Sequence, residues 1–423
     1  MAEELKMDFS FSEFEDKLNP KPFYTLFFVN VIMSLFFIQA LRSYIPGVYI
    51  ALFHVVFGHN IIENLLVLLT MVFFALPALT NTICKKIKMR SIAIFSIYII
   101  AILRLLIALH LPNIWQTIFS GLIVSFYGVF ISTFLTIWIK DKSDNINSNN
   151  KIILVIFSIF CSFLLDYLIR TIGFSQDISL LPPGLIAEYW FITQYIWLLV
   201  QITLTAICIY LTRLYFPRFS PSNDEKSNKE KLSTIYSLIF VGNGIFWFLL
   251  FNIFFDPNII AHYTGTDYYF NNILSILSLI IAILIILRVR RQYFSNVKLV
   301  GILNSVMILS LCLFLFIGRL LTYFASIFIS ITLIIMYLNY FLLFERLATI
   351  NFKWETVKTI SNGIAISFVF YILFTVLHIF ASDWAYVISA FKGYGPLIVL
   401  LAGIIFSILT CISVKIKSNK EVI

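Results

Sequence analysis

The sequence predicts an all-α polytopic membrane protein, and three observations carry that prediction. Of the 423 residues, 61% are hydrophobic and only 12% are charged. A soluble domain carries about 25% charged residues, so this chain lacks the charge to cover a soluble surface. Long apolar runs recur between short polar connections, and lysine and arginine gather in every second connection. The composition therefore excludes a soluble enzyme, a disordered protein and a disulfide-held scaffold.

Twelve apolar runs are long enough to cross a bilayer, because about 20 helical residues span a hydrocarbon core of roughly 30 Å. They cover 23–41, 62–82, 91–109, 115–139, 152–172, 189–216, 233–256, 269–289, 299–318, 322–345, 359–381 and 395–413. The stretch 42–61 is also apolar but contains Pro46, Gly47 and Gly58. We expect it to extend the first helix and then form an external connection. A separate re-entrant segment is the alternative.

The positive charges predict the orientation. With both termini in the cytoplasm, 24 of the 30 lysines and arginines fall in inner segments, as the positive-inside rule requires. The net charge of +9 is thus spread over short loops instead of one basic domain. This pattern argues against a nucleic-acid partner and suits the anionic inner leaflet of a bilayer. We expect a multi-pass plasma-membrane protein.

A polar linker predicts two halves. The segment at 217–232 is the most polar stretch of the chain and separates six spans from six. Short cationic loops follow the second and eighth spans, CKKIKMRS (84–91) and RVRRQYFSNVK (288–298). The expected domains are a cytoplasmic amphipathic N-terminus (1–22), a first half (23–216), the linker (217–232), a second half (233–413) and a cytoplasmic tail (414–423).

This organisation resembles the major facilitator superfamily. The resemblance covers nearly the whole chain and implies two six-helix halves around a site at the membrane midplane. The loop PALTNTICKKIKMRS (77–91) keeps the family's basic residues but has Asn81 in place of an acid. A weaker resemblance, in 164–179 and 255–269, is to the facilitator-like membrane modules of GPI-anchor lipid-remodelling proteins.

Charged residues within the spans are the first candidates for a binding site, because each costs about 2.5–3.5 kcal/mol to insert. Asp166 and Arg170 lie four residues apart on the fifth span, so they share one helix face. Arg104, on the third span, has no acid within a helical turn and needs a partner on another helix, for which Asp166 is the candidate. Together the three predict a net positive outer cavity for an anionic ligand. A neutralised pair, or arginines that only anchor their helices at the interface, is the alternative.

Asparagines within the spans are further candidates. Asn243 and Asn252 lie on the seventh span, and Asn30 lies on the first. The family resemblance implies that the first, fourth, seventh and tenth spans line the cavity, which favours these three residues as solute contacts. Hydrogen bonding between helices is the alternative for them, and it applies equally to Gln194, Gln201 and Asn304.

Catalytic, metal and cofactor sites are not predicted. The sequence has no HExxH, GxSxG or P-loop motif, and its five cysteines lie in or beside apolar segments without metal-ligand spacing. His54 and His59 have no third ligand in view. Proton coupling through His378, late in the eleventh span, is a minor alternative. We expect neither enzyme activity nor a cofactor.

The leading functional prediction is a facilitator-like secondary transporter or flippase. It would move a small anionic or amphipathic molecule, either a free solute or a lipid headgroup, by alternating access. The alternative is a non-transporting membrane module or scaffold in lipid or surface-glycan metabolism, acting with a separate soluble enzyme. A membrane-embedded transferase is a third and weaker alternative.

Overall fold

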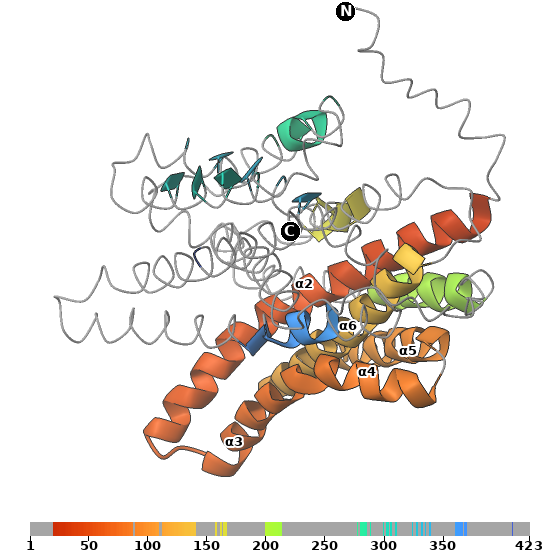
Figure 1. Ribbon diagram of the computed structural model, residues 1–423. Coiled ribbons are helices and arrows are strands. Elements are labelled where there is room, and N and C mark those ends of the chain that lie inside the picture. The colour runs from red at the N-terminus through yellow and green to blue at the C-terminus, as the bar shows by residue number, and fades with distance from the viewer. Residues whose placement is uncertain are drawn as a thin grey trace, which may run out of the picture.

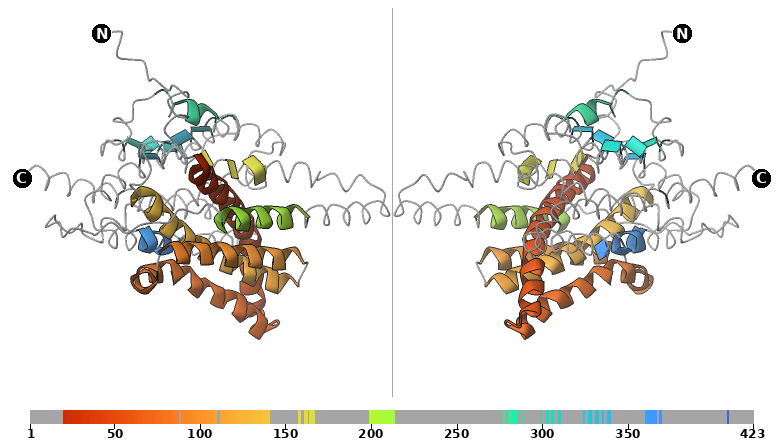
Figure 2. Two further views of the ribbon diagram at one scale, coloured as in Figure 1. Left: turned by 90° about the vertical axis from the view of Figure 1, so that its right-hand side faces the viewer. Right: turned by 90° about the vertical axis from the view of Figure 1, so that its left-hand side faces the viewer.

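A computed structural model describes residues 20–87, 89–109, 112–140 and 199–213, with shorter helical pieces within 157–166, 277–310, 324–339 and 360–369 and at 408. Apart from short turns, the described residues are helical, and no strand occurs among them. Figure 1 shows α3 to α6 lying along one side of the long helix α2. In both views of Figure 2 the pieces within 277–310 lie at the opposite end of the molecule from α3. The all-α class predicted from the sequence is therefore confirmed.

Helix α2 spans Pro20–Val56 without interruption. Its 37 residues are about 56 Å long at 1.5 Å per residue, well beyond the thickness of a hydrocarbon core. The helix ends just before Gly58 (φ 76°) and Asn60 (φ 42°), whose left-handed backbone turns the chain into the next span. The expected extension of the first helix is confirmed, and the alternative of a separate re-entrant segment is wrong.

The second span consists of three consecutive pieces, α3 (Ile61–Leu69), the 3-10 helix η2 (Thr70–Ala75) and α4 (Leu76–Lys86). Pro77 is the second residue of α4 and lacks a backbone N–H, so it cannot donate to a carbonyl in the preceding turn. The Thr70 hydroxyl donates to the Val67 carbonyl at 2.6 Å and lies 2.8 Å from the Tyr44 hydroxyl of α2. The middle of this span is therefore wound more tightly than an α-helix and is tied to α2.

The third and fourth predicted spans correspond to α5 (Met89–Ala108) and α6 (Asn113–Lys140). Among the described residues, three segments are long and apolar enough to cross a membrane: Ile61–Thr80, Met89–Ala108 and Asn113–Thr136. The shorter apolar helices Thr25–Leu41 and Leu199–Arg213 fall on the first and sixth predicted spans. The total of twelve spans and the division into two halves extend to residues outside the described ranges and stay predictions.

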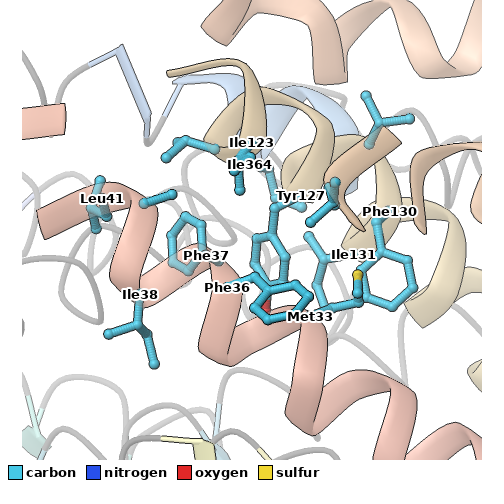
Figure 3. Close-up of a cluster of buried hydrophobic side chains, with 14 of the residues drawn as sticks. Met33, Phe36, Phe37, Ile38, Leu41, Ile123, Tyr127, Phe130, Ile131 and Ile364 are labelled. Carbon is cyan, nitrogen blue, oxygen red and sulfur yellow. The ribbon is translucent and has the colours of Figure 1, made fainter. Parts of the chain in front are cut away.

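The core is formed where α2 and α5 both pack against α6. Every residue of α2 from Val29 to Leu41 is buried, so this stretch is enclosed on all sides. Phe37 of α2 stacks on Tyr127 of α6 with 4.3 Å between ring centroids, as Figure 3 shows. In contrast, α3 exposes large apolar side chains such as Ile62 and Leu66, which is the pattern of a helix that faces lipid.

Candidate functional site

Arg104 of α5 lies inside the N-terminal bundle with only 5% of its surface exposed. Its Nη2 donates to Oε1 of Gln39 on α2 at 2.7 Å, and its Nε donates to Oε1 of Gln201, on the helix at 199–213, at 3.1 Å. A guanidinium has donors only, so both amides must turn their oxygens toward it. Arg104 thus joins three separate segments of the chain.

Asp166 is also buried, and its carboxylate interacts electrostatically with the Arg104 guanidinium. This interaction agrees with Asp166 as the expected partner of Arg104, and a role of either residue in binding a solute stays a prediction. We refer to Gln39, Arg104, Asp166 and Gln201 as the Arg104 cluster. It draws together α2, α5, the helix at 199–213 and the piece within 157–166.

The cluster lies toward the outer side of the membrane in the predicted orientation. Arg104 is about 22 Å beyond Met89 at 1.5 Å per residue, and Met89 lies in the cationic loop at 84–91. The pair formed by Arg104 and Asp166 carries no net charge, and the two glutamines supply neutral acceptors. This arrangement lowers the cost of keeping an arginine in an apolar bundle. It also binds the helices of the bundle to one another.

Asn30 forms a second polar contact, nearer to the N-terminal end of α2 than Gln39 is. It is buried on α2, and its Nδ2 donates to the Ser158 hydroxyl. Along the chain, Asn30 precedes Gln39 by nine residues and Ser158 precedes Asp166 by eight. Both helices therefore advance in the same direction between the two contacts, as expected for the first and fifth spans. The observed role of Asn30 joins two helices, and its contact with a solute stays a prediction.

Three buried polar atoms near these contacts have no hydrogen-bond partner: Oδ1 of Asn30, Nε2 of Gln201 and Oγ1 of Thr205. Thr205 differs from its neighbours on the same helix. Thr203 and Thr212 donate to the carbonyls four residues earlier, at 2.8 Å and 2.7 Å. An unmade hydrogen bond costs about 1–3 kcal/mol in a protein interior, so each of these atoms weakens the packed state.

The other sequence-predicted site residues lie outside the described ranges, namely Arg170, Asn243 and Asn252. Sequence reasoning missed Gln39, although a glutamine within an apolar span is the same signal that singled out Gln201. His54 and His59 lie near the C-terminal end of α2 with 6.1 Å between ring centroids. Within the described part of the chain, no group of three histidine, cysteine or acidic residues is placed to hold a metal ion.

No family model matches the sequence, and no curated protein matches it in sequence. Solved structures match its fold. The transporter FucP, the fucose:proton symporter of E. coli, in its outward conformation has a TM-score of 0.60 and 13% identity over 93% of this chain and 98% of its own. The human organic anion transporter MFSD10 has a TM-score of 0.58 and 11% identity over 92% of this chain and 100% of its own.

A bacterial homologue of the human lysosomal transporter Spinster, in an inward-facing conformation, has a TM-score of 0.51 and 14% identity over 95% of this chain and 98% of its own. At such identities the likeness concerns the fold. This chain therefore has the major facilitator fold, as its resemblance to that superfamily predicted, and it is a polytopic membrane protein.

Proposed function

We propose that this protein is a secondary transporter or flippase that moves a small anionic or amphipathic solute by alternating access. The observation that carries the proposal is the buried Arg104 with its two glutamine acceptors and Asp166. The fold alone does not select a solute, because the similar structures include a fucose:proton symporter and an organic anion transporter. The net positive charge expected from Arg104 and Arg170 together with Asp166 therefore carries the argument for an anion.

A guanidinium presents several N–H groups in one plane, which suits a carboxylate or phosphate group. Gln39 and Gln201 are neutral acceptors, and an anionic oxygen makes a stronger hydrogen bond to Arg104 than an amide oxygen does. A solute can therefore displace them when the bundle loosens. In the predicted fifth span Arg170 comes four positions after Asp166, so the two arginines and one carboxylate would carry a net charge of +1, which one anionic group neutralises.

The transport cycle uses the two predicted halves, 23–216 and 233–413, joined by the cytoplasmic linker 217–232. The halves rock about a midplane site that opens to one side of the plasma membrane at a time. Asn30, Asn243 and Asn252 are the neutral solute contacts of this proposal, and both termini are cytoplasmic. The protein carries out no chemical reaction in this scheme.

A second candidate is a non-transporting membrane module that acts with a separate soluble enzyme. The observation in its favour is that Arg104, Asp166 and Gln201 are buried and interact with one another. A scaffold would use such a cluster only to hold its helices together. The two candidates differ in one measurable respect, because only a transporter moves solute across a sealed bilayer.

The test begins with the purified protein and a thermal-shift screen of small carboxylates, inorganic phosphate, sugar phosphates and glycerophosphate headgroups. A bound ligand raises the melting temperature according to its occupancy. Compounds that stabilise the protein are then tested for uptake into proteoliposomes. We expect Arg104→Lys to abolish both effects, and Arg213→Lys, at an exposed position on the helix at 199–213, to retain them. Stabilisation without uptake would favour the scaffold.

A further inference from the structure

Residues of the predicted eleventh span pack deep into the N-terminal bundle. Phe368 stacks against Phe37 of α2 with 5.9 Å between ring centroids, and it meets Phe74 of η2 edge-on at 6.2 Å. Ile364, one helical turn earlier, is buried in the same hydrophobic cluster, part of which Figure 3 shows. These contacts join segments that are more than 200 positions apart in the sequence.

The surface that receives Phe368 depends on a missing side chain. A Cβ atom added at Gly128 of α6 would lie 2.5 Å from Cγ of Pro77, 2.8 Å from Cε2 of Phe368 and 3.2 Å from Cγ2 of Ile364. Distances this short are not tolerated in packed interiors, so only glycine fits there. We call Phe37, Phe74, Pro77, Tyr127 and Gly128 the Phe368 socket.

The part of the socket formed by α2 and α6 is held together by contacts of its own. Tyr127 stacks on Phe37, and its hydroxyl lies 2.9 Å from the hydroxyl of Ser34 on α2. Tyr127 stands at the middle of α6, half-way between Asn113 and Lys140, and Phe74 stands in the 3-10 segment at the middle of the second span. The socket therefore lies near the membrane midplane, where a solute must pass.

We propose that Phe368 in its socket is a latch that closes the interface between the two halves at the midplane and must leave the socket during the transport cycle. The inference rests on the proposed function, which requires the halves to move apart. The ring contacts of Phe368 are apolar, so they can separate without leaving a polar group unpaired. The Arg104 cluster lies within the first half, so the separation of the two halves does not by itself pull its segments apart.

The test compares two glycines of α6. Gly128→Ala places a methyl group against Phe368, whereas Gly121→Ala places one against Tyr44 and Thr70, with contacts of 2.6 Å and 3.0 Å inside the N-terminal bundle. Both changes introduce a similar clash, but only the first is in the socket. The reporter is Ile364→Cys in a background without the five native cysteines, labelled in proteoliposomes by a charged, membrane-impermeant methanethiosulfonate.

We expect Gly128→Ala to raise the labelling rate at position 364 by about tenfold through a shift toward the open state, and Gly121→Ala to leave it unchanged. Phe368→Ala, which removes the latch without a clash, must also raise it and serves if Gly128→Ala fails to fold. If Gly128→Ala and Phe368→Ala label at position 364 no faster than Gly121→Ala, the latch is wrong. Labelling requires no solute. Faster labelling without uptake would therefore refute the proposed transport but keep Phe368 as the residue that closes this interface, and uptake without faster labelling would keep the transport and refute the latch.

Discussion

The Arg104 cluster and the Phe368 socket hold the protein together by opposite means. The cluster joins α2, α5 and the helix at 199–213 through charged and amide groups, and separating it would leave a charge unpaired in an apolar interior. The socket joins α2, η2 and α6 to the piece at 360–369 through stacked rings and one glycine. Polar contacts of this kind suit a unit that moves as a rigid body, and apolar contacts suit a surface that opens and closes.

The largest effect that separates the two regions is expected from the charge pair. Arg104→Met leaves the Asp166 carboxylate buried beside an apolar side chain, which costs about 3–5 kcal/mol for a broken buried pair. Adding Asp166→Leu removes the remaining charge, so the double variant should recover a large part of this loss. Unfolding of the purified protein in detergent, followed by circular dichroism, measures both. If the double variant loses as much stability as Arg104→Met and Asp166→Leu lose together when each is made alone, the two residues do not act as a pair.

A smaller effect tests the part of the socket formed by α2 and α6. Tyr127→Phe keeps the ring that stacks on Phe37 but removes the hydroxyl that faces Ser34. We expect the free energy of unfolding to fall by about 1 kcal/mol, the usual net contribution of one hydrogen bond. Ser34→Ala should cost a similar amount, and the double variant should cost no more than either alone. A double variant whose loss equals the sum of the two single losses would show that this hydrogen bond does not link α2 to α6.

The sequence predicted the features that depend on membrane solvation. A long apolar run must be helical in lipid, because backbone groups have no water to bond to. The first four described spans accordingly lie where they were expected. Arg104 could be paired with Asp166 from the sequence, because an arginine within a span needs an acceptor and Asp166 was the economical candidate.

The sequence did not predict the features that depend on packing between distant segments. The chain has 45 phenylalanines, and nothing in its local sequence distinguishes Phe368 from the others. Its role depends on Gly128 and Phe74, which are brought to it only by the fold. Gln39 was missed for a related reason. A neutral amide in a span can form hydrogen bonds with many kinds of group, so the sequence does not predict its partner. Likewise, Pro77 indicates a helix irregularity but does not predict that Thr70–Ala75 wind as a 3-10 helix.

The smallest expected effect concerns a residue beside the Arg104 cluster, where a substitution is expected to stabilise the protein instead of destabilising it. Thr205 and Thr212 are both buried on the helix at 199–213, but only the Thr212 hydroxyl has a partner, the Cys208 carbonyl at 2.7 Å. Thr205→Val removes an unpaired hydroxyl and should stabilise the protein by up to about 1 kcal/mol, whereas Thr212→Val should destabilise it by about the same amount. Thermal unfolding of the two matched variants measures the difference. If Thr205→Val instead destabilises the protein as much as Thr212→Val, the Thr205 hydroxyl has a partner in the membrane, and the interior beside Arg104 is more polar than its packing indicates.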